Sequence, residues 1–489
     1  MDAHVKLLTL KRIGIAVLVG SAFTYGFAAA YFRIYPYFAI RDAAVGTRAL
    51  VTEVRQRFGD AASEQSLDDE TRAQLEALGY LQGYQPAPEE SGIVVHERDR
   101  SFQGLNLYVS AHAPAAFLMD MDGEILHEWR YDYERACPEH FDPDSPHQAG
   151  WGRARALDNG DVVALFHYNA LIRVDKDSRL IWALCEPYHH DIAIGEDGLI
   201  TTIRTDPRTD PRISGRHEFQ DDAIAILQPD GKLSKRISIF DALMASPYAS
   251  HLRLVDEENL AETGDIFHNN AVKLIDGRNA HKLAALKAGN LMISIRELDT
   301  VAILDPEQEK IVWALSGMWQ RQHEPVPLDN GNFLVFDNQS GPDWSNVFEV
   351  DPTNQEIAWS YRGDEQNRFR STCCGTNQRL PNGNTLVTSS EQGTAFEVTP
   401  DNEIVWKFVN PARLDDGDLI ATLFDLRRLA DDESPDWLRA PTARGSKARE
   451  GGKHESPPPD PGRRERKVST GSVTTTVTLA GPQAIAPKR

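Results

Sequence analysis

The stretches VAILDPEQEKIVW, from Val301 to Trp313, and VPLDNGNFLVF, from Val326 to Phe336, decide the fold of this chain. In each stretch an apolar run is followed by a turn rich in Asp, Asn, Gly or Pro, and then by a second apolar run. This pattern is typical of a β-hairpin, and Asn-Gly between apolar runs is its strongest short signal. The two stretches therefore predict two consecutive hairpins, which together make four antiparallel strands.

Both kinds of hairpin recur along the chain. The turns of the first kind are anchored at Asp120, Asp175, Gln228, Asp305, Asp351 and Thr399. The second kind recurs as ALDNGDVVALF, IAIGEDGLITTI, LKAGNLMISI, VPLDNGNFLVF and QRLPNGNTLVT. A four-stranded unit that repeats every ~50 residues is typical of a propeller blade. The repeats therefore predict an all-β protein with a six-bladed β-propeller over residues 101–435.

The repeats also predict how the blades pack. A tryptophan recurs at one strand position, which favours packing between blades: Trp129, Trp182, Trp313, Trp359 and Trp406. The strand GLNLYVS, from Gly104 to Ser110, is expected to help close the ring against the last blade. The longest repeat contains two insertions, Asp241–Ile266 and Gly277–Ala288, which we expect to project from a rim of the ring.

Composition excludes several classes of protein. The 489 residues are 41% hydrophobic and 26% charged, as in a folded globular protein. A net charge of −21 repels phosphate backbones, so nucleic acid is not expected as a partner. Four cysteines without a CxxC motif exclude a disulfide-dense scaffold and a zinc ribbon. Cys137 and Cys185 could pair across adjacent blades, whereas a bond between the vicinal Cys373 and Cys374 would be strained, and the sequence leaves both questions open.

The two ends of the chain differ from the repeats. Residues Ile13 to Phe32 carry no charge and are long enough to cross ~30 Å of hydrocarbon. Because Lys6, Lys11 and Arg12 precede them, we expect a cytoplasmic N-terminus over 1–12 and a single-pass anchor in the inner membrane over 13–33. The propeller would then lie on the periplasmic side. A cleaved signal peptide is the alternative. Residues 34–100 are expected to form a stalk with a short helix, and residues 436–489 a disordered, basic, Pro/Gly/Ser-rich tail.

Histidines mark a possible site of chemistry. Four of them stand before successive second hairpins: His147, His190, His268 and His323. A position that repeats in every blade lies on a ring around the propeller axis, so these imidazoles are expected to converge on one face of the central channel. A single histidine would more often have a structural role, and His189 is expected to point to the opposite face of its strand.

The run from HNNAVKL through GNLMISIRELDTVAILDP and QHEPVPLDNGNFLVFDN to FEVTPDNEIVWKFVNP resembles the bacterial arylsulfate sulfotransferases and their arylsulfotransferase-like relatives. The resemblance covers roughly Gly104 to Pro411. Its most specific part is His-x-Asn, then an arginine on the next strand, then Gln-His. The resemblance implies a periplasmic six-bladed propeller that moves a sulfuryl group from an aryl sulfate to a phenolic acceptor without the nucleotide donor PAPS, and that needs no cofactor or metal.

The resemblance also implies the roles of individual residues. His323 matches the nucleophile that becomes transiently sulfated, and His190, His268, Asn270 and Arg296 match the other catalytic residues. Imidazole is largely neutral at neutral pH, as a nucleophile must be. Arg296 and Asn270 would hold the sulfuryl oxygens, and either His190 or His268 would transfer the proton.

Alternatives remain for each of these roles. Arg296 could form an ion pair with Glu297 or Asp299, and Asn270 could cap a turn. The whole protein could be a non-catalytic propeller that binds a ligand, a metal or a protein partner through its channel histidines. A zinc or binuclear centre is a further possibility, whereas a quinone-dependent dehydrogenase is disfavoured because six blades are too few.

Overall fold

The computed structural model describes residues 85–143, 145–341, 344–363, 369–414, 417–430 and 436–439. The expected membrane anchor, most of the expected stalk and the tail from residue 440 onward lie outside these residues. Within the described ranges, no helix has both the length and the apolar character needed to cross a membrane. The chain divides into one unit that ends at Pro435 and a second that starts at Asp436. The second unit begins with a short helix, α7 (Asp436–Arg439), where the sequence predicts disorder.

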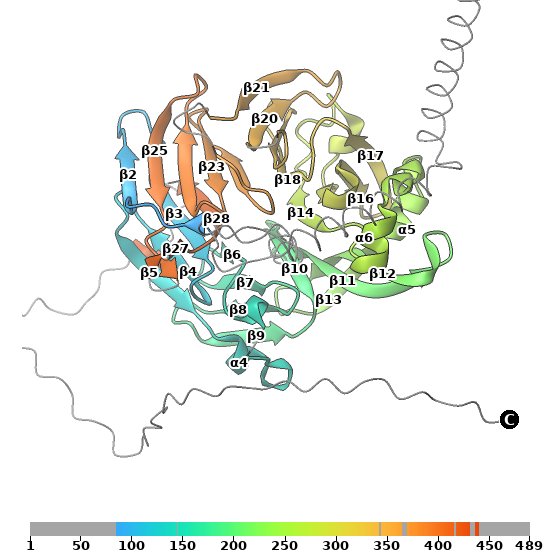
Figure 1. Ribbon diagram of the computed structural model, residues 1–489, viewed down its shortest axis with the longest axis horizontal. Coiled ribbons are helices and arrows are strands. Elements are labelled where there is room, and N and C mark those ends of the chain that lie inside the picture. The colour runs from blue at the N-terminus through green and yellow to red at the C-terminus, as the bar shows by residue number, and fades with distance from the viewer. Residues whose placement is uncertain are drawn as a thin grey trace, which may run out of the picture. The chain divides into compact units, whose positions relative to one another are not determined.

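The first unit consists mainly of antiparallel sheets. The described residues form five sheets of four strands, one of five strands and one of three. Figure 1 shows the larger sheets arranged around a common centre. The first four of them are β28 (Leu423–Ala430), β3 (Gly104–Ser110), β4 (Ala115–Met119) and β5 (Ile125–Arg130); β6 (Arg153–Ala156), β7 (Val162–Phe166), β8 (Ala170–Val174) and β9 (Leu180–Leu184); β10 (Tyr188–Ile194), β11 (Ile200–Asp210), β12 (Ser214–Leu227) and β13 (Leu233–Ser238); and β14 (Asn269–Leu274), β15 (Leu291–Ile295), β16 (Thr300–Asp305) and β17 (Lys310–Ser316).

The remaining sheets complete the unit. They are β18 (His323–Pro327), β19 (Phe333–Asp337), β20 (Asn346–Val350) and β21 (Ile357–Tyr361); β22 (Thr376–Arg379), β23 (Thr385–Ser389), β24 (Thr394–Val398), β25 (Ile404–Val409) and β2 (Gly92–His96); and the small sheet of β1 (Gln85–Pro86), β27 (Leu419–Ile420) and β26 (Arg413–Leu414). The strands β6, β10, β14, β18, β22 and β28 contact one another in a closed cycle. The prediction of an all-β, propeller-like fold is therefore confirmed.

The ring closes by joining the two ends of the unit. Strand β28 pairs with β3 along its length, from Leu423 opposite Ser110 to Ala430 opposite Gly104. Strand β2 adds to the outer edge of the last sheet by pairing with β25. The strand Gly104–Ser110 therefore takes part in closure, but it does so inside the first sheet and not against the last one. The repeat pattern does not predict β28, because no hairpin turn connects this strand to its neighbour β3.

Burial explains why the repeat is so regular. The second strand of three of the larger sheets, β7, β15 and β19, is largely apolar and wholly buried, because a neighbouring sheet covers each of its faces. The outermost strands, such as β5 and β21, are largely exposed. The recurring tryptophans pack between sheets as predicted: the indole N–H of Trp129 donates to Gly160 O at 2.8 Å, and that of Trp406 donates to Met121 O at 3.1 Å.

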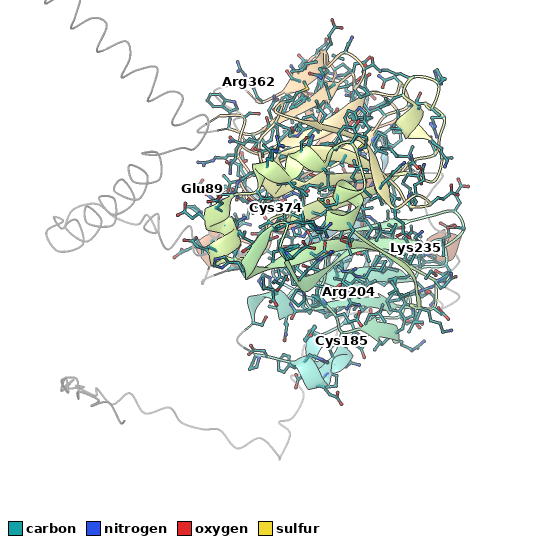
Figure 2. The ribbon with its side chains drawn as sticks, turned by 90° about the vertical axis from the view of Figure 1, so that its right-hand side faces the viewer. Glu89, Cys185, Arg204, Lys235, Arg362 and Cys374 are labelled. Atoms are coloured by element: carbon teal, nitrogen blue, oxygen red, sulfur yellow. A yellow bond between two sulfur atoms is a disulfide. The ribbon has the colours of Figure 1, made fainter. Side chains whose placement is uncertain are left out.

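The short helices lie between the sheets in the sequence. Helix α5 (Ile239–Met244) begins just before the first insertion and continues into it. The first insertion also contains η3 (Ala249–Leu254) and α6 (Glu257–Glu262), and the second contains η4 (Ala284–Leu286). The others are α4 (Tyr133–Ala136), η1 (Pro138–His140), η2 (Pro146–Gln148) and η5 (Arg296–Leu298). A disulfide with an S–S distance of 2.03 Å joins Cys137, after α4, to Cys185, after β9. The disulfide therefore ties the connection that leaves the first sheet to the second sheet, at the position of Cys185 labelled in Figure 2.

Candidate active site

Three of the inner strands begin with a shift in register. The shifts occur near the first residues of β10, β14 and β18. His190, His268 and Glu324, which lie at or next to these shifts, have φ angles of 62°, 44° and 45°. Residues other than glycine rarely adopt such angles, and bulges of this kind re-aim side chains near active sites. The bulge in β10 explains why two consecutive side chains are both buried in the interior, that of His190 among the imidazoles and that of Asp191 among the charges described below.

The structure brings three of the four predicted histidines together, since the charge of His268 lowers the pKa of both His190 and His323. The ring of His190 lies 4.7 Å from that of His268 and 5.4 Å from that of His167, centroid to centroid. His190, His268 and His323 are 3%, 9% and 4% exposed. His147 lies in η2, where its ring meets Tyr168 at 6.3 Å. The site is therefore a nearly closed group of imidazoles at the inner ends of neighbouring sheets.

Hydrogen bonds define which nitrogen of His323 carries the proton. Its Nδ1 lies 2.7 Å from Asn338 Oδ1 and 3.1 Å from Arg321 O. The Nδ2 of Asn338 donates to the carbonyls of Ser371 (2.6 Å) and Cys374 (2.9 Å), so this end of the amide must be the NH₂ group. Asn338 Oδ1 therefore accepts from His323 Nδ1–H, which leaves the lone pair on Nε2. This Nε2 is buried and has no hydrogen-bond partner among the described residues.

A carboxylate lies on the Nδ1 side of each of the other two histidines. It contacts His268 directly, and it lies beyond His189 in the case of His190. His268 Nδ1 lies 2.5 Å from Asp265 Oδ2. Burial tends to raise the pKa of Asp265, but the charge and hydrogen bond of His268 outweigh burial and lower that pKa to about 2. His190 Nδ1 lies 2.6 Å from His189 Nδ1, and His189 Nε2 lies 3.2 Å from Asp222 Oδ1. His189 thus lies between His190 and the carboxylate of Asp222, although its Nε2 makes no hydrogen bond among the described residues and strand alternation predicts that it points the other way.

Burial keeps three of these imidazoles neutral. It lowers the pKa of His323 well below the ordinary value, and the charge of Arg296 lowers it further. Burial and the neighbouring imidazoles, His268 first, likewise lower the pKa of His190. Burial and Arg153 do the same for His167. A neutral His323 has a lone pair on Nε2 at neutral pH, so it can act as a nucleophile there.

These shifts predict how stability depends on pH. In the unfolded chain each histidine binds a proton below a pKa of ~6.5, whereas the folded state does not bind it until lower pH. Stability should therefore fall as pH drops below about 6.5, by ~1.4 kcal/mol per pH unit for each of the three histidines. Urea unfolding at pH ~7 and ~5.5 measures this change. His167→Asn should reduce the slope and the exposed His281→Asn should leave it unchanged, whereas a slope of zero in the natural chain would contradict the prediction.

The other two predicted residues lie beside the histidines. Asn270 Nδ2 donates to Gln322 O at 2.9 Å, so Asn270 holds the residue that precedes His323, and its Oδ1 is buried without a partner among the described residues. Arg296 is the first residue of η5, and its backbone N–H donates to His268 O at 3.3 Å. Its guanidinium pairs with Glu297 at 2.6 Å, which is the contact that the alternative interpretation expects. Arg296 also lowers the pKa of His323, so its charge reaches the imidazole.

The hairpin and histidine patterns of the sequence do not predict two residues of the site. His167 and Asn338 each come immediately after the second strand of a sheet, β7 and β19, as Arg296 comes immediately after β15. Their side chains thus reach the site from one equivalent position in three sheets. This shared position is a signal that the sequence contains, because each strand is preceded by a recognisable Asn-Gly or Gly-Asn turn.

A cluster of buried charges adjoins the histidines. It contains the cations Arg153, Arg155 and Lys273 and the anions Asp191, Glu324 and Asp425, and Arg427, whose side chain is 33% exposed, lies at its edge. Asp191 directly follows His190, and its carboxylate lies 3.0 Å from Arg155 and 2.6 Å from Lys273. Arg153 Nε donates to His190 O at 2.9 Å. The cluster joins the inner strands of five sheets and fixes the backbone on which the histidines stand.

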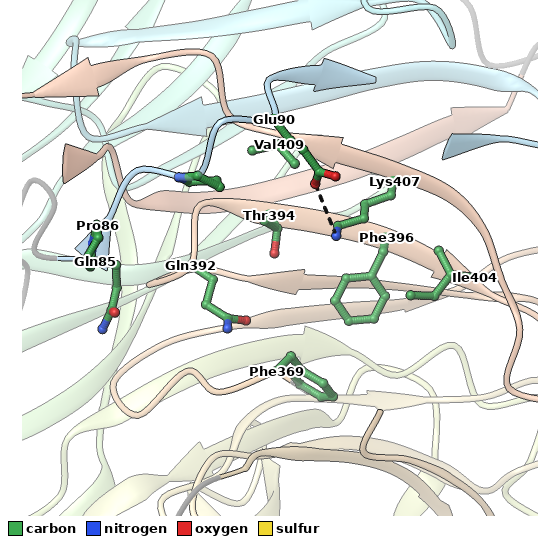
Figure 3. Close-up of a pocket in the computed structure, with 11 residues that line it drawn as sticks. Gln85, Pro86, Glu90, Phe369, Gln392, Thr394, Phe396, Ile404, Lys407 and Val409 are labelled. Atoms are coloured by element: carbon green, nitrogen blue, oxygen red, sulfur yellow. Dashed lines mark ion pairs between the residues drawn. The ribbon is translucent and has the colours of Figure 1, made fainter. Parts of the chain in front are cut away.

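Two further features bear on ligands. Within the described ranges, no three His, Cys, Asp or Glu side chains are grouped so that they could hold one metal ion. A cavity of about 280 Å³ lies over β24 and β25 and is lined by residues that include Phe369, Phe396 and Lys407 (Figure 3). None of the histidines of the site lines this cavity, so it is separate from the candidate active site.

Residues 153–411 match the arylsulfotransferase (ASST) family, and this chain belongs to that family. The matched range contains all five predicted site residues. Membership supports an arylsulfotransferase-like function, with aryl sulfates and phenols as the general class of substrate. No curated protein sequence matches the chain.

Solved structures similar to this one include several propellers. A protein of unknown function from Bacteroides caccae has a TM-score of 0.44 at 12% identity, covering 66% of this chain and 98% of that one. A streptogramin B lyase has a TM-score of 0.38 at 12% identity, covering 72% and 96%. The WD40 β-propeller domain of Doa1 has a TM-score of 0.37 at 11% identity, covering 71% and 95%. Structural similarities at this level support no conclusion about function.

Proposed function

We propose that this chain is a six-bladed propeller enzyme that moves a sulfuryl group from an aryl sulfate to a phenol, without PAPS, through a sulfated His323. The observation that carries the proposal is the environment of His323. Its Nδ1 proton is held by Asn338 and Arg321, and its buried Nε2 has no partner among the described residues. Membership in the arylsulfotransferase family supports the class of reaction.

The first half-reaction forms the sulfohistidine. The lone pair of His323 Nε2 forms a bond to sulfur while the bond from sulfur to the aryl oxygen breaks, and its electron pair leaves on the phenolate. Protonated His268 then gives the phenolate a proton. The guanidinium of Arg296 and the second Nδ2–H of Asn270 donate to the sulfuryl oxygens, which stay negatively charged throughout.

The second half-reaction reverses these roles. The acceptor phenol gives its proton to His268, its oxygen attacks sulfur, and the N–S bond breaks so that the pair returns to His323 Nε2. The groups that contact the Nδ1 atoms of His268 and His323 support these different roles, proton transfer for His268 and nucleophilic attack for His323. A carboxylate such as Asp265 behind an imidazole stabilises the cation that forms on proton uptake, whereas an amide such as Asn338 fixes the tautomer and leaves the ring neutral. His190, whose Nδ1 lies 2.6 Å from His189 Nδ1, is a second candidate for proton transfer.

The experiment that tests the proposal uses donor without acceptor. After incubation with an aryl sulfate, the protein should gain the mass of one sulfuryl group, located under non-acidic conditions in the peptide that contains His323. Phenol release without this gain would mean that water takes the sulfuryl group directly, and it would contradict a sulfohistidine intermediate. Neither release nor gain would favour the alternative, a propeller that binds a ligand, metal or protein partner without catalysis.

Asn338 offers a prediction about the tautomer. Asn338→Leu keeps the size of the side chain but removes the acceptor for His323 Nδ1–H, so kcat should fall on the order of a hundredfold or more, with little change in KM. Asn338→Asp, which keeps the acceptor oxygen, should restore part of the activity. Steady-state kinetics together with the ¹⁵N resonances of His323 measure both effects. A normal kcat in the Leu variant would show that Asn338 does not position the nucleophile.

We further propose that an anchor over Ile13–Phe32 holds the propeller on the periplasmic side of the inner membrane. The Cys137–Cys185 disulfide supports this compartment, since structural disulfides persist under oxidising conditions. A reporter fused after Pro411 should be accessible to protease added outside spheroplasts. Protection of the fusion would contradict the proposed topology.

A further inference from the structure

The two cysteines outside the disulfide lie in the loop that holds the candidate nucleophile. Cys373 and Cys374 are not disulfide-bonded, and their Sγ atoms are 2.7 Å apart. The carbonyl of Cys374 accepts from Asn338 Nδ2 at 2.9 Å, and Asn338 in turn holds His323 Nδ1 at 2.7 Å. A short chain of contacts therefore links the thiol pair to the imidazole.

We propose that Cys373 and Cys374 are a reversible modification site, at which a vicinal disulfide forms and loosens the hold on His323. The coupling to activity rests on the proposed function of His323, whereas the modification itself does not. The chain already contains one disulfide, between Cys137 and Cys185, so conditions that oxidise its thiols are part of its environment. Cys373 is partly exposed, which gives an oxidant access to the pair, while Cys374 is 7% exposed.

The step is a thiol–disulfide exchange with a small-molecule disulfide. The Cys373 sulfur attacks one sulfur of the oxidant, whose S–S bond breaks and releases one thiol. Cys374 then attacks the mixed disulfide, forms the Cys373–Cys374 bond and releases the second thiol. The protons of the two cysteines end on the two released thiols, so two cysteines are oxidised and one disulfide is reduced. A disulfide between adjacent residues is strained, and strained disulfides are the ones that reductants reopen readily.

The local contacts indicate that oxidation is slow at neutral pH. A hydrogen bond from the Cys373 thiol to Cys374, burial and the charge of Glu391 raise the pKa of Cys373. Because the thiolate is the attacking species, the exchange should speed up as pH rises. The pair thus remains reduced unless oxidant is abundant or persistent.

Formation of the Cys373–Cys374 disulfide should affect the imidazole of His323 through the backbone carbonyl of Cys374. Joining adjacent side chains constrains the peptide between Cys373 and Cys374 and moves the Cys374 carbonyl. Asn338 then loses one of its two acceptors, and the imidazole of His323 is held less firmly. Since small displacements of a reacting group are costly, kcat should fall by about tenfold or more, and a dithiol reductant should restore it.

The test uses the full chain and oxidised glutathione as the probe. Trypsin releases both cysteines in one peptide, STCCGTNQR, from Ser371 to Arg379. After oxidation and alkylation this peptide should carry no alkyl group and be lighter by two hydrogens, and after reduction it should carry two alkyl groups. Cys373→Ser, which cannot close the ring but keeps Cys137–Cys185, is the matched control. Its turnover should not respond to the oxidant.

The readouts separate this proposal from the proposed function. Two alkyl groups on the peptide after oxidation would overturn the modification site. A closed ring that leaves both turnover and the ¹⁵N resonances of His323 unchanged would overturn the coupling. If the reduced protein turns over no aryl sulfate, the proposed function fails, and the peptide mass and His323 resonances still decide whether the pair closes and whether closure reaches the imidazole.

Discussion

Replacing His323 by alanine is expected to abolish both phenol release and labelling of the protein by an aryl sulfate. The proposed N–S bond has no other site of formation once Nε2 is removed. The fold should survive, because His323 begins β18 and its backbone pairing to Phe336 does not depend on the imidazole. Removal of a nucleophile typically lowers kcat by several orders of magnitude. Intact mass, peptide mapping and circular dichroism of the same preparation measure all three results.

Two sets of controls accompany this variant. His190→Ala and His268→Ala should slow turnover while leaving the protein able to accept the label, because each removes a proton-transfer group and not the nucleophile. His127→Ala, on the outer strand β5, should have normal activity. A label on the His323→Ala protein would move the nucleophile to His190 or His268.

Asp191→Asn is expected to be strongly destabilising although it is a conservative change. The carboxylate of Asp191 is fully buried and lies within 3.0 Å of both Arg155 and Lys273. These contacts hold its pKa far below the ordinary range against the effect of burial. Neutralising it leaves two buried cations without this partner, and breaking a buried ion pair on one side costs about 3–5 kcal/mol. Urea or thermal unfolding measures the loss.

The cluster of charges supplies its own control. Lys273→Met should cost less stability in the Asp191→Asn background than in the natural chain, because Lys273 then keeps only Glu324 as a close partner. Asp177→Asn breaks ion pairs to Lys176 and Arg179 at an exposed turn and should have no measurable effect. If Asp191→Asn were as stable as the natural chain, the cluster would not hold the inner strands together.

The fold could be predicted because most of its signals are local. A hairpin such as that of β18 and β19 carries both apolar runs and its Asn-Gly turn within one stretch of sequence. Strand β28 could not be predicted in this way, since its partner β3 lies at the other end of the unit. The extension of β11 and β12 beyond a normal hairpin, to 11 and 14 residues, was missed because polar residues fill it.

The candidate site was predictable only in part. The repeated position before each second hairpin brings His190 close to His268, which the structure shows at 4.7 Å. The groups behind the imidazoles could not be predicted from strand alternation. The bulge at β10 turns His189 toward His190, and Asn338 reaches His323 from the end of β19. Such contacts depend on how neighbouring sheets meet, which no single stretch of sequence encodes.

The pairing of β28 with β3 has a consequence for how the protein folds. The first sheet to be synthesised lacks its inner strand until Leu423–Ala430 has emerged, and that strand also carries Asp425 and Arg427 of the charged cluster. Contacts between such distant parts of a chain form slowly, because a long loop must close before they can form. The unit therefore cannot mature sheet by sheet from its N-terminus. Until the last strand arrives, an incomplete ring with an exposed strand edge has to be kept from aggregating.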